Sequence, residues 1–252
     1  MTRKSQAASP QPGITFTTFI CAALAAAAFA APAQAAKIGF EEGYGALYGS
    51  GDFYTEAGYR FEFESPHADS EGSLVGANMD GSDPSWCANM ACPTSNSGAF
   101  YGTLNDSMVY VGAENGNPFR LLGFDASFIG RSTDLGSYLP TVGLIEVLGL
   151  TTDGAVVGDD FWLNGPGNDG FSFQSFLSSS LFDNTFLLLQ MTAYACLGDG
   201  FCYRGSTNMA QFGLDNMQLV DAGAAEVPEP ATGLIFGLGL MGLVAAARRR
   251  NA

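Results

Sequence analysis

The chain has 252 residues, of which 47% are hydrophobic, and it carries a formal net charge of −15. Between residues 37 and 225, five Lys and Arg residues stand against 23 Asp and Glu residues, a net charge of −18. A domain this acidic repels phosphate backbones, which excludes nucleic acid as a partner. A chain this rich in Phe, Tyr, Leu and Val can bury a core, which excludes general disorder, and roughly 190 residues are enough for one domain.

The first 35 residues have the pattern of a secretory signal peptide. Arg3 and Lys4 form a positive start, and an apolar stretch follows over residues 14–31. Small residues then end at Ala35, so we expect signal peptidase to cut between Ala35 and Ala36. An uncleaved transmembrane anchor is the alternative, but the small-residue site directly after the apolar stretch favours cleavage.

The middle of the chain has the pattern of short β-strands separated by clusters of Gly, Asn, Asp and Ser, with no convincing helix. Residues 59–64 alternate apolar and charged side chains, which predicts a half-buried strand. Over residues 119–129 the alternation is offset after Leu121, which indicates a bulge. The other predicted strands are 108–111, 142–150, 156–163, 171–177, 185–194 and 211–220. Residues 36–225 are therefore predicted to form one all-β domain, an antiparallel β-sandwich of jelly-roll-like type.

The four cysteines after the signal peptide are Cys87, Cys92, Cys196 and Cys202. An even number in an exported chain predicts two disulfides, and local pairing is the simplest of three connectivities. Zinc is the alternative, but the spacings are not those of a zinc knuckle, and the single histidine, His67, lies far away in sequence. Residues 65–97 form the least regular predicted loop, which we expect to be functional, pinned by the first disulfide, or both.

The C-terminal residues 226–252 form a distinct tail. Pro228, Glu229 and Pro230 interrupt any strand or helix. Residues 231–247 carry no charge, and arginines follow at 248–250. This run is slightly shorter than the roughly 20 residues of a full membrane span, but it predicts a transmembrane helix with its arginines in the cytoplasm. The domain before the tail would then face outward.

These three features, in this order, resemble the PEP-CTERM sorting signal of Gram-negative bacteria; a plain tail anchor is the alternative. The resemblance implies that exosortase, a membrane enzyme, processes the tail near Pro-Glu-Pro. It also implies export, with an association with exopolysaccharide or biofilm production. Residues 211–216 resemble the Gln-Phe-x-x-Asp motif of one subgroup and similar strands that close jelly-roll carbohydrate-binding domains. The alternation in this segment also switches face near Asp215 and Asn216, which predicts a second bulge.

No catalytic set is evident in the sequence. There is one histidine, no nucleophile motif and no metalloprotease motif. Asp159 and Asp160 could serve glycoside hydrolysis in principle, but solvated carboxylates are the simpler interpretation. We therefore expect no enzymatic activity.

Calcium is the one cofactor that the sequence suggests, as a structural ion. If the first and last strands are neighbours, four carboxylates could converge on one hard cation, with surface acidity and an Asp215 that caps its own bulge as the alternative. They are Glu41, Glu42, Asp52 and Asp215.

The expected role is that of an envelope or extracellular-matrix protein, structural or adhesive, within an exopolysaccharide matrix. The alternative is a dedicated carbohydrate-binding module that stacks sugars on exposed Trp86, Tyr101 and Trp162. Solvent exposure of these rings would separate the two. Signal peptidase and exosortase are the expected partners, and the expected route leads from an inner-membrane-anchored intermediate to the cell surface or beyond.

Overall fold

The computed structural model describes residues 35–66, 73–87, 90–94, 98–198, 200–204 and 209–222. Outside these ranges lie the predicted signal peptide up to residue 34, the single histidine, His67, and the tail with its predicted membrane helix at 231–247. Within them, no helix has the length and apolar character that a membrane crossing needs.

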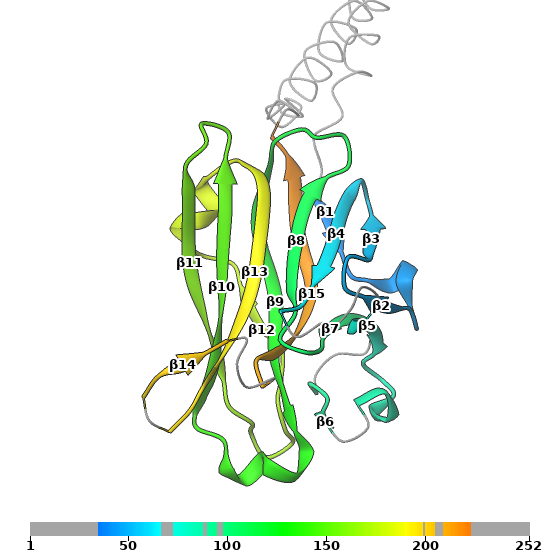
Figure 1. Ribbon diagram of the computed structural model, residues 1–252, viewed down its shortest axis with the longest axis vertical. Helices are drawn as coiled ribbons and strands as arrows, with labels where there is room; N and C mark the ends of the chain where they lie inside the picture. Colours follow the sequence, from blue (N-terminus) through cyan, green and yellow to red (C-terminus); the bar gives the residue numbers. More distant parts are fainter. Residues whose placement is uncertain are drawn as a thin grey trace, which may run out of the picture. The chain divides into compact units, whose positions relative to one another are not determined.

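The described strands are antiparallel and form two layers (Figure 1). The first sheet runs β2 (Leu47–Gly49), β5 (Leu74–Asp80), β7 (Ala99–Thr103), β15 (Gln211–Asp221) and β9 (Phe119–Arg131). β1 (Ala36–Ile38) also pairs with β15, and β6 (Met90–Ala91) and β12 (Gln174–Phe176) pair with β9. The second sheet runs β3 (Phe53–Glu56), β4 (Tyr59–Glu64), β8 (Met108–Ala113), β13 (Phe186–Cys196), β10 (Thr141–Thr151) and β11 (Val156–Asn164), with β14 (Cys202–Tyr203) on β13. The all-β antiparallel sandwich is thus confirmed.

The two sheets join at one point and otherwise pack face to face. Phe186 of β13 pairs with Phe119 of β9, which links the two sheets at this one residue pair. Between the layers lies an aromatic core, in which Phe63 of β4 stacks on Tyr101 of β7 with ring centroids 4.2 Å apart. Short 3₁₀ helices connect strands at η1 (Glu41–Gly43), η2 (Pro84–Cys87), η3 (Ser132–Ser137) and η4 (Ser180–Asp183).

Both bulges expected from the sequence are present. In β9 the partner of Leu219 is Leu121 and the partner of Gln218 is Gly123, so Leu122 is the extra residue. In β15 the register shifts between Asp215 and Gln218. Most predicted strands are also present, but of residues 171–177 only Gln174–Phe176 form a strand.

The long loop predicted over residues 65–97 is partly wrong, because β5 lies inside it. β5 has five consecutive buried residues and so does β7, so neither strand shows the alternation that marks a half-buried strand. A second, smaller core explains this burial: Met79, Phe100 and Ile129 on the outer side of the first sheet pack with Cys87 of the loop that follows β5.

Both disulfides form with the predicted local pairing. Cys87 is bonded to Cys92, and Cys196 is bonded to Cys202. The first closes the loop that covers the second core, and the second closes the β13–β14 hairpin. Both therefore fasten loops onto a sandwich whose main core lies elsewhere.

Candidate functional site

The three aromatic residues expected to hold sugars lie in three different environments. Tyr101 is 0% exposed and stacks on Phe63 in the main core, so it presents no face to a ligand and the expectation for this residue is wrong. Trp86 is half-buried against the second core and makes a T-shaped ring contact with the exposed Tyr44. Trp162 on β11 is 52% exposed. Trp162 is therefore the strongest of the three as a contact residue.

The four carboxylates expected to share calcium are not gathered into one site. Glu41 accepts a hydrogen bond from the Ala99 N–H at 3.0 Å, and Asp52 accepts one from the Gly49 N–H at 2.6 Å. Asp215 accepts from the Asn216 N–H at 2.6 Å, which is the bulge cap weighed as the alternative.

Glu41 and Asp215 both lie close to Gly39. A Cβ added to Gly39 would lie 3.6 Å from Glu41 Cγ and 3.8 Å from Asp215 Oδ1. Throughout the described ranges, no three His, Cys, Asp or Glu side chains are placed to share a metal ion. Glu41, Asp52 and Asp215 instead accept hydrogen bonds from backbone N–H groups.

The outer side of the second sheet carries a different set of side chains, which we call the open face. It consists of the even-numbered residues within 144–150 of β10, 158–162 of β11 and 188–194 of β13, since successive side chains of a strand point to opposite sides. Their odd-numbered neighbours, such as Ile145, Phe161 and Met191, are buried in the main core.

Trp162 begins a row of three side chains across this face. The pairing places Trp162 beside Leu144 and Leu144 beside Tyr194. Leu144 is only 7% exposed. Two aromatic residues therefore flank a covered aliphatic one, about 10 Å apart by strand spacing.

Polar side chains of the open face are held in place by hydrogen bonds. Tyr194 Oη donates to Glu146 Oε2 at 3.0 Å, and Gln190 Nε2 donates to Thr192 Oγ1 at 3.0 Å. The Arg204 guanidinium lies 5.8 Å from the centre of the Tyr194 ring. Because these groups stand on a regular sheet and restrain one another, they form a preorganised surface of hydrogen-bonding groups.

The open face is electrostatically negative next to Trp162. Glu146 pairs directly with Asp160 across β10 and β11, an arrangement in which like charges repel. Desolvation, followed by the charges of Glu146 and Asp159, raises the pKa of Asp160. Desolvation, followed by the hydrogen bond to Glu146, raises the pKa of Tyr194, so its hydroxyl stays a donor at neutral pH. Such a surface accepts hydrogen bonds from hydroxyl groups and disfavours anions.

The side-chain amide of Gln174 hydrogen-bonds to the backbone at the edge of β11, as a neighbouring strand would. Gln174 Oε1 accepts from the Asn164 N–H at 2.7 Å, and Gln174 Nε2 donates to the Trp162 carbonyl at 3.4 Å. These bonds occupy backbone groups at the edge of the strand and hold the backbone that carries Trp162.

Sequence reasoning identified Trp162 but missed the other residues of the open face. Glu146, Gln190 and Tyr194 all lie in segments predicted as strands. Side-chain alternation places the even-numbered residues of β10, β11 and β13 on the same side as Trp162. This signal identifies them only once the pairing of the strands is known.

Comparison with known proteins identifies the tail. Residues 226–250 match the family described as the PEP-CTERM protein-sorting motif. The chain therefore carries the signal of an exported, exosortase-sorted protein, as the resemblance implied. The match does not reach Gln211–Asp215, so membership of the subgroup stays a prediction. No protein with a curated description matches the chain.

Solved structures with some likeness to this chain include carbohydrate-binding modules. TmCBM61 in complex with beta-1,4-galactotriose is 10% identical, with a TM-score of 0.33, over 72% of this chain and 92% of that one. The CBM22-2 xylan-binding domain of Paenibacillus barcinonensis Xyn10C is 13% identical, with a TM-score of 0.30, over 74% and 99%. Tailspike protein 4 of bacteriophage CBA120 is 11% identical, with a TM-score of 0.28, over 65% and 19%. At such TM-scores the likeness carries no argument about what this chain binds.

Proposed function

We propose that this protein is exported, is held at the inner membrane by its tail until exosortase processes it, and then serves as a structural or adhesive component that binds exopolysaccharide through the open face. The sorting motif at residues 226–250 supports the route. Two disulfides also suit an oxidising compartment outside the cytoplasm. Within this proposal the sandwich is of jelly-roll type, the tail inserts as a membrane helix, and no catalysis is involved.

The start of the fold supports removal of the signal peptide. β1 begins at Ala36, the first residue after the expected cleavage site, and its three residues pair with Leu219, Gln218 and Met217 of β15. A cut after Ala35 would leave the first strand whole. N-terminal sequencing of the exported form should give Ala36, and a start at Met1 would refute cleavage.

The observation that carries polysaccharide binding is the exposed Trp162 beside restrained polar groups. A sugar ring offers an apolar C–H face that packs on an aromatic ring, and hydroxyl groups that donate to carboxylates and amides. Trp162 provides the ring, Glu146 on the neighbouring strand β10 provides an acceptor, and Gln190 on β13 provides another farther along the open face. Because Glu146 and Asp160 disfavour anions, neutral sugars are the expected ligands of this face.

The Glu146–Asp160 pair also favours a second candidate, a glycoside hydrolase, since that reaction uses two carboxyl groups and one with a raised pKa. Glu146 is already engaged by Tyr194, which supports binding over catalysis. Incubating the protein with the host exopolysaccharide decides between them. New reducing ends that disappear in Glu146→Gln would move the assignment to a hydrolase.

The binding test is affinity electrophoresis of the full exported chain through gels that contain the host exopolysaccharide. Trp162→Ala should weaken retardation at least about tenfold, the effect of losing roughly 1.4 kcal/mol. Tyr44→Ala is the matched control, because Tyr44 is similarly exposed, at 57%, but belongs to the turn after η1 and not to the open face. Loss with Tyr44→Ala and not with Trp162→Ala would place the site elsewhere.

The sorting test replaces Pro228, Glu229 and Pro230 with alanine. Processing should stop while membrane insertion continues, because the apolar run at 231–247 is unchanged. Immunoblots of membranes and culture fluid then show a full-length, membrane-bound form. Normal processing and release of this variant would mean that Pro-Glu-Pro is not the recognition element.

A further inference from the structure

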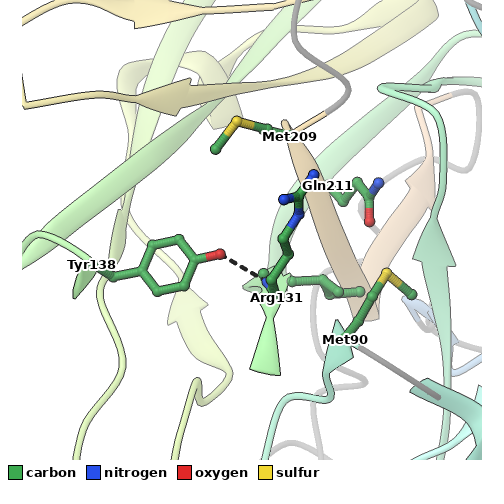
Figure 2. Close-up of a pocket in the computed structure, with 7 residues that line it drawn as sticks. Met90, Arg131, Tyr138, Met209 and Gln211 are labelled. Carbon is green, nitrogen blue, oxygen red and sulfur yellow. Dashed lines mark hydrogen bonds between the residues drawn. The ribbon is translucent and has the colours of Figure 1, made fainter. Parts of the chain in front are cut away.

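A pocket lies at the end of the sandwich that is remote from the point where the chain leaves it. β15 runs from Gln211, opposite Ile129, to Asp221, opposite Phe119. Its 11 residues separate the two ends by roughly 35 Å. The pocket, of about 200 Å³, is lined at the Gln211 end by Met90, Arg131, Tyr138 and Met209 (Figure 2).

Both disulfide-closed loops contribute to the walls of this region. Met90 belongs to the loop closed by Cys87 and Cys92, and β6 ties it to Arg131. Cys196 lines an adjoining cavity of about 390 Å³ that shares Tyr138 and Met209 with the first. The walls are therefore held in position before any ligand arrives, which reduces the entropy lost on binding.

Tyr138 presents a hydroxyl proton to the pocket. Its oxygen accepts a hydrogen bond from the Arg131 N–H at 2.7 Å, so its own hydrogen remains to be donated (Figure 2). This position requires a glycine beneath it, because a Cβ on Gly130 would lie 2.5 Å from the Tyr138 oxygen. Gly130 thus allows the ring to lie across the end of β9.

Arg131 brings an unneutralised positive charge to the same place. Its side chain extends past Tyr138 toward Met209 and Gln211 (Figure 2). In the part of the chain that the structure describes, the one ion pair joins Arg60 to Glu62, and the two cation–π contacts use Arg60 and Arg204. In a domain with a net charge of −18, an arginine that faces a pocket without a carboxylate partner is placed to receive one from a ligand.

We infer that this pocket, the Arg131 pocket, binds a carboxyl-bearing sugar residue of an extracellular polysaccharide. The carboxylate pairs with the Arg131 guanidinium and accepts from the Tyr138 hydroxyl, while the sugar ring packs on the side chains of Met90 and Met209. The sugar as the source of the carboxylate rests on the proposed function; the carboxylate itself rests on the pocket alone. The two surfaces would then select different units, neutral sugars on the open face and acidic ones here.

The test uses the full exported chain, purified in detergent and titrated by calorimetry and ligand-observed NMR. Galacturonate should bind, and galactose, which has a hydroxymethyl group in place of the carboxylate, should bind at least tenfold more weakly. Arg131→Gln should reduce galacturonate affinity at least tenfold. Arg131→Lys should fall between, because it keeps the charge and loses the planar fork, and Tyr138→Phe should lose about three- to tenfold.

Trp162→Ala separates this inference from the proposed function. It should leave galacturonate binding unchanged while it weakens retention by the host polysaccharide; unchanged retention would count against the open face alone. Equal affinities for galacturonate and galactose, or full affinity in a folded Arg131→Gln protein with an unchanged melting temperature, would overturn the Arg131 pocket. Stronger binding of N-acetylglycine than of galacturonate would overturn the assignment to a sugar.

Discussion

The two sheets of this sandwich differ in what covers their outer sides. Part of the outer side of the first sheet is covered by the Cys87–Cys92 loop, which builds a second core with Met79 and Phe100. The outer side of the second sheet presents Trp162 and its polar neighbours to solvent. Which sheet a residue belongs to, and which side of that sheet it faces, therefore decide whether it is buried or available for contact.

The largest expected effect comes from comparing two aromatic residues that looked alike in the sequence. Tyr101→Ala should lower the free energy of unfolding by about 3–5 kcal/mol, because it empties a fully buried site against Phe63. Trp162→Ala should cost well under 2 kcal/mol, since half of the side chain is already in water. Denaturant titration measures both. A Tyr101→Ala protein within 1 kcal/mol of the parent would show that the first sheet is not packed as described.

The disulfides allow a second comparison. Replacing Cys87 and Cys92 together by alanine should cost about 2 kcal/mol in chain entropy, plus the packing of the second core. The matched pair, Cys196 and Cys202, closes a loop of similar length on a half-exposed hairpin and should cost about the entropic part alone. Equal losses in thermal unfolding would mean that the Cys87–Cys92 loop does not act as a cover.

A third comparison concerns β11, the edge strand of the second sheet. Gln174→Ala should cost about 1 kcal/mol and increase self-association with concentration, because it uncovers backbone groups of Asn164 and Trp162. Sedimentation velocity at several concentrations measures the association. Ser175→Ala on the same strand is the control and should remain like the parent, since its side chain is exposed. Association of both variants alike would exclude Gln174 as the edge cap.

The smallest expected effect is a pair of opposite pH dependences on one hairpin. The raised pKa of Asp160 means that folding favours its proton, so its charge costs stability at neutral pH. Asp160→Asn should raise the melting temperature slightly at pH 7, and the gain should vanish as the pH falls below the ordinary aspartate pKa of about 3.9.

Asp153 in the β10–β11 turn is the matched opposite. The hydrogen bond from Thr151, followed by that from the Ala155 N–H, lowers its pKa, so its charge stabilises the fold above the ordinary pKa. Asp153→Asn should therefore lower the melting temperature at pH 7, with the difference lost as the pH falls through the lowered pKa. The same sign in both variants would contradict the described contacts.

The contrast between the sheets also explains how much could be predicted. β4 and β11 alternate because one side faces water, and their segments were recognised. β5 and β7 are buried on both sides, with a glycine in each, and no local pattern marks them. Bulges were predictable at Leu121 and Asp215, since a bulge shifts the alternation itself.

The candidate sites depend on the pairing of strands, which the amino-acid sequence alone does not reveal. Tyr101 and Trp162 each follow a phenylalanine in the sequence, and only the register puts one inside and the other outside. The neighbourhood of Arg131 and Tyr138 likewise depends on a glycine and on β6, a strand of two residues. Four carboxylates suggested calcium because their number was visible, whereas the hydrogen bonds of Glu41, Asp52 and Asp215 to backbone N–H groups were not.

Hydroxyl-radical footprinting of the full exported chain, with and without the host exopolysaccharide, asks directly which sheet makes the contact. Oxidation of Trp162 and Tyr194 should fall when the polysaccharide is present, because both lie in the row that would be covered. Oxidation of Trp86 and Tyr44 should stay unchanged, since they lie on the loop that covers the first sheet and on the turn after η1. Protection of Trp86 and Tyr44, with Trp162 still fully oxidised, would contradict the assignment of the open face as the binding surface.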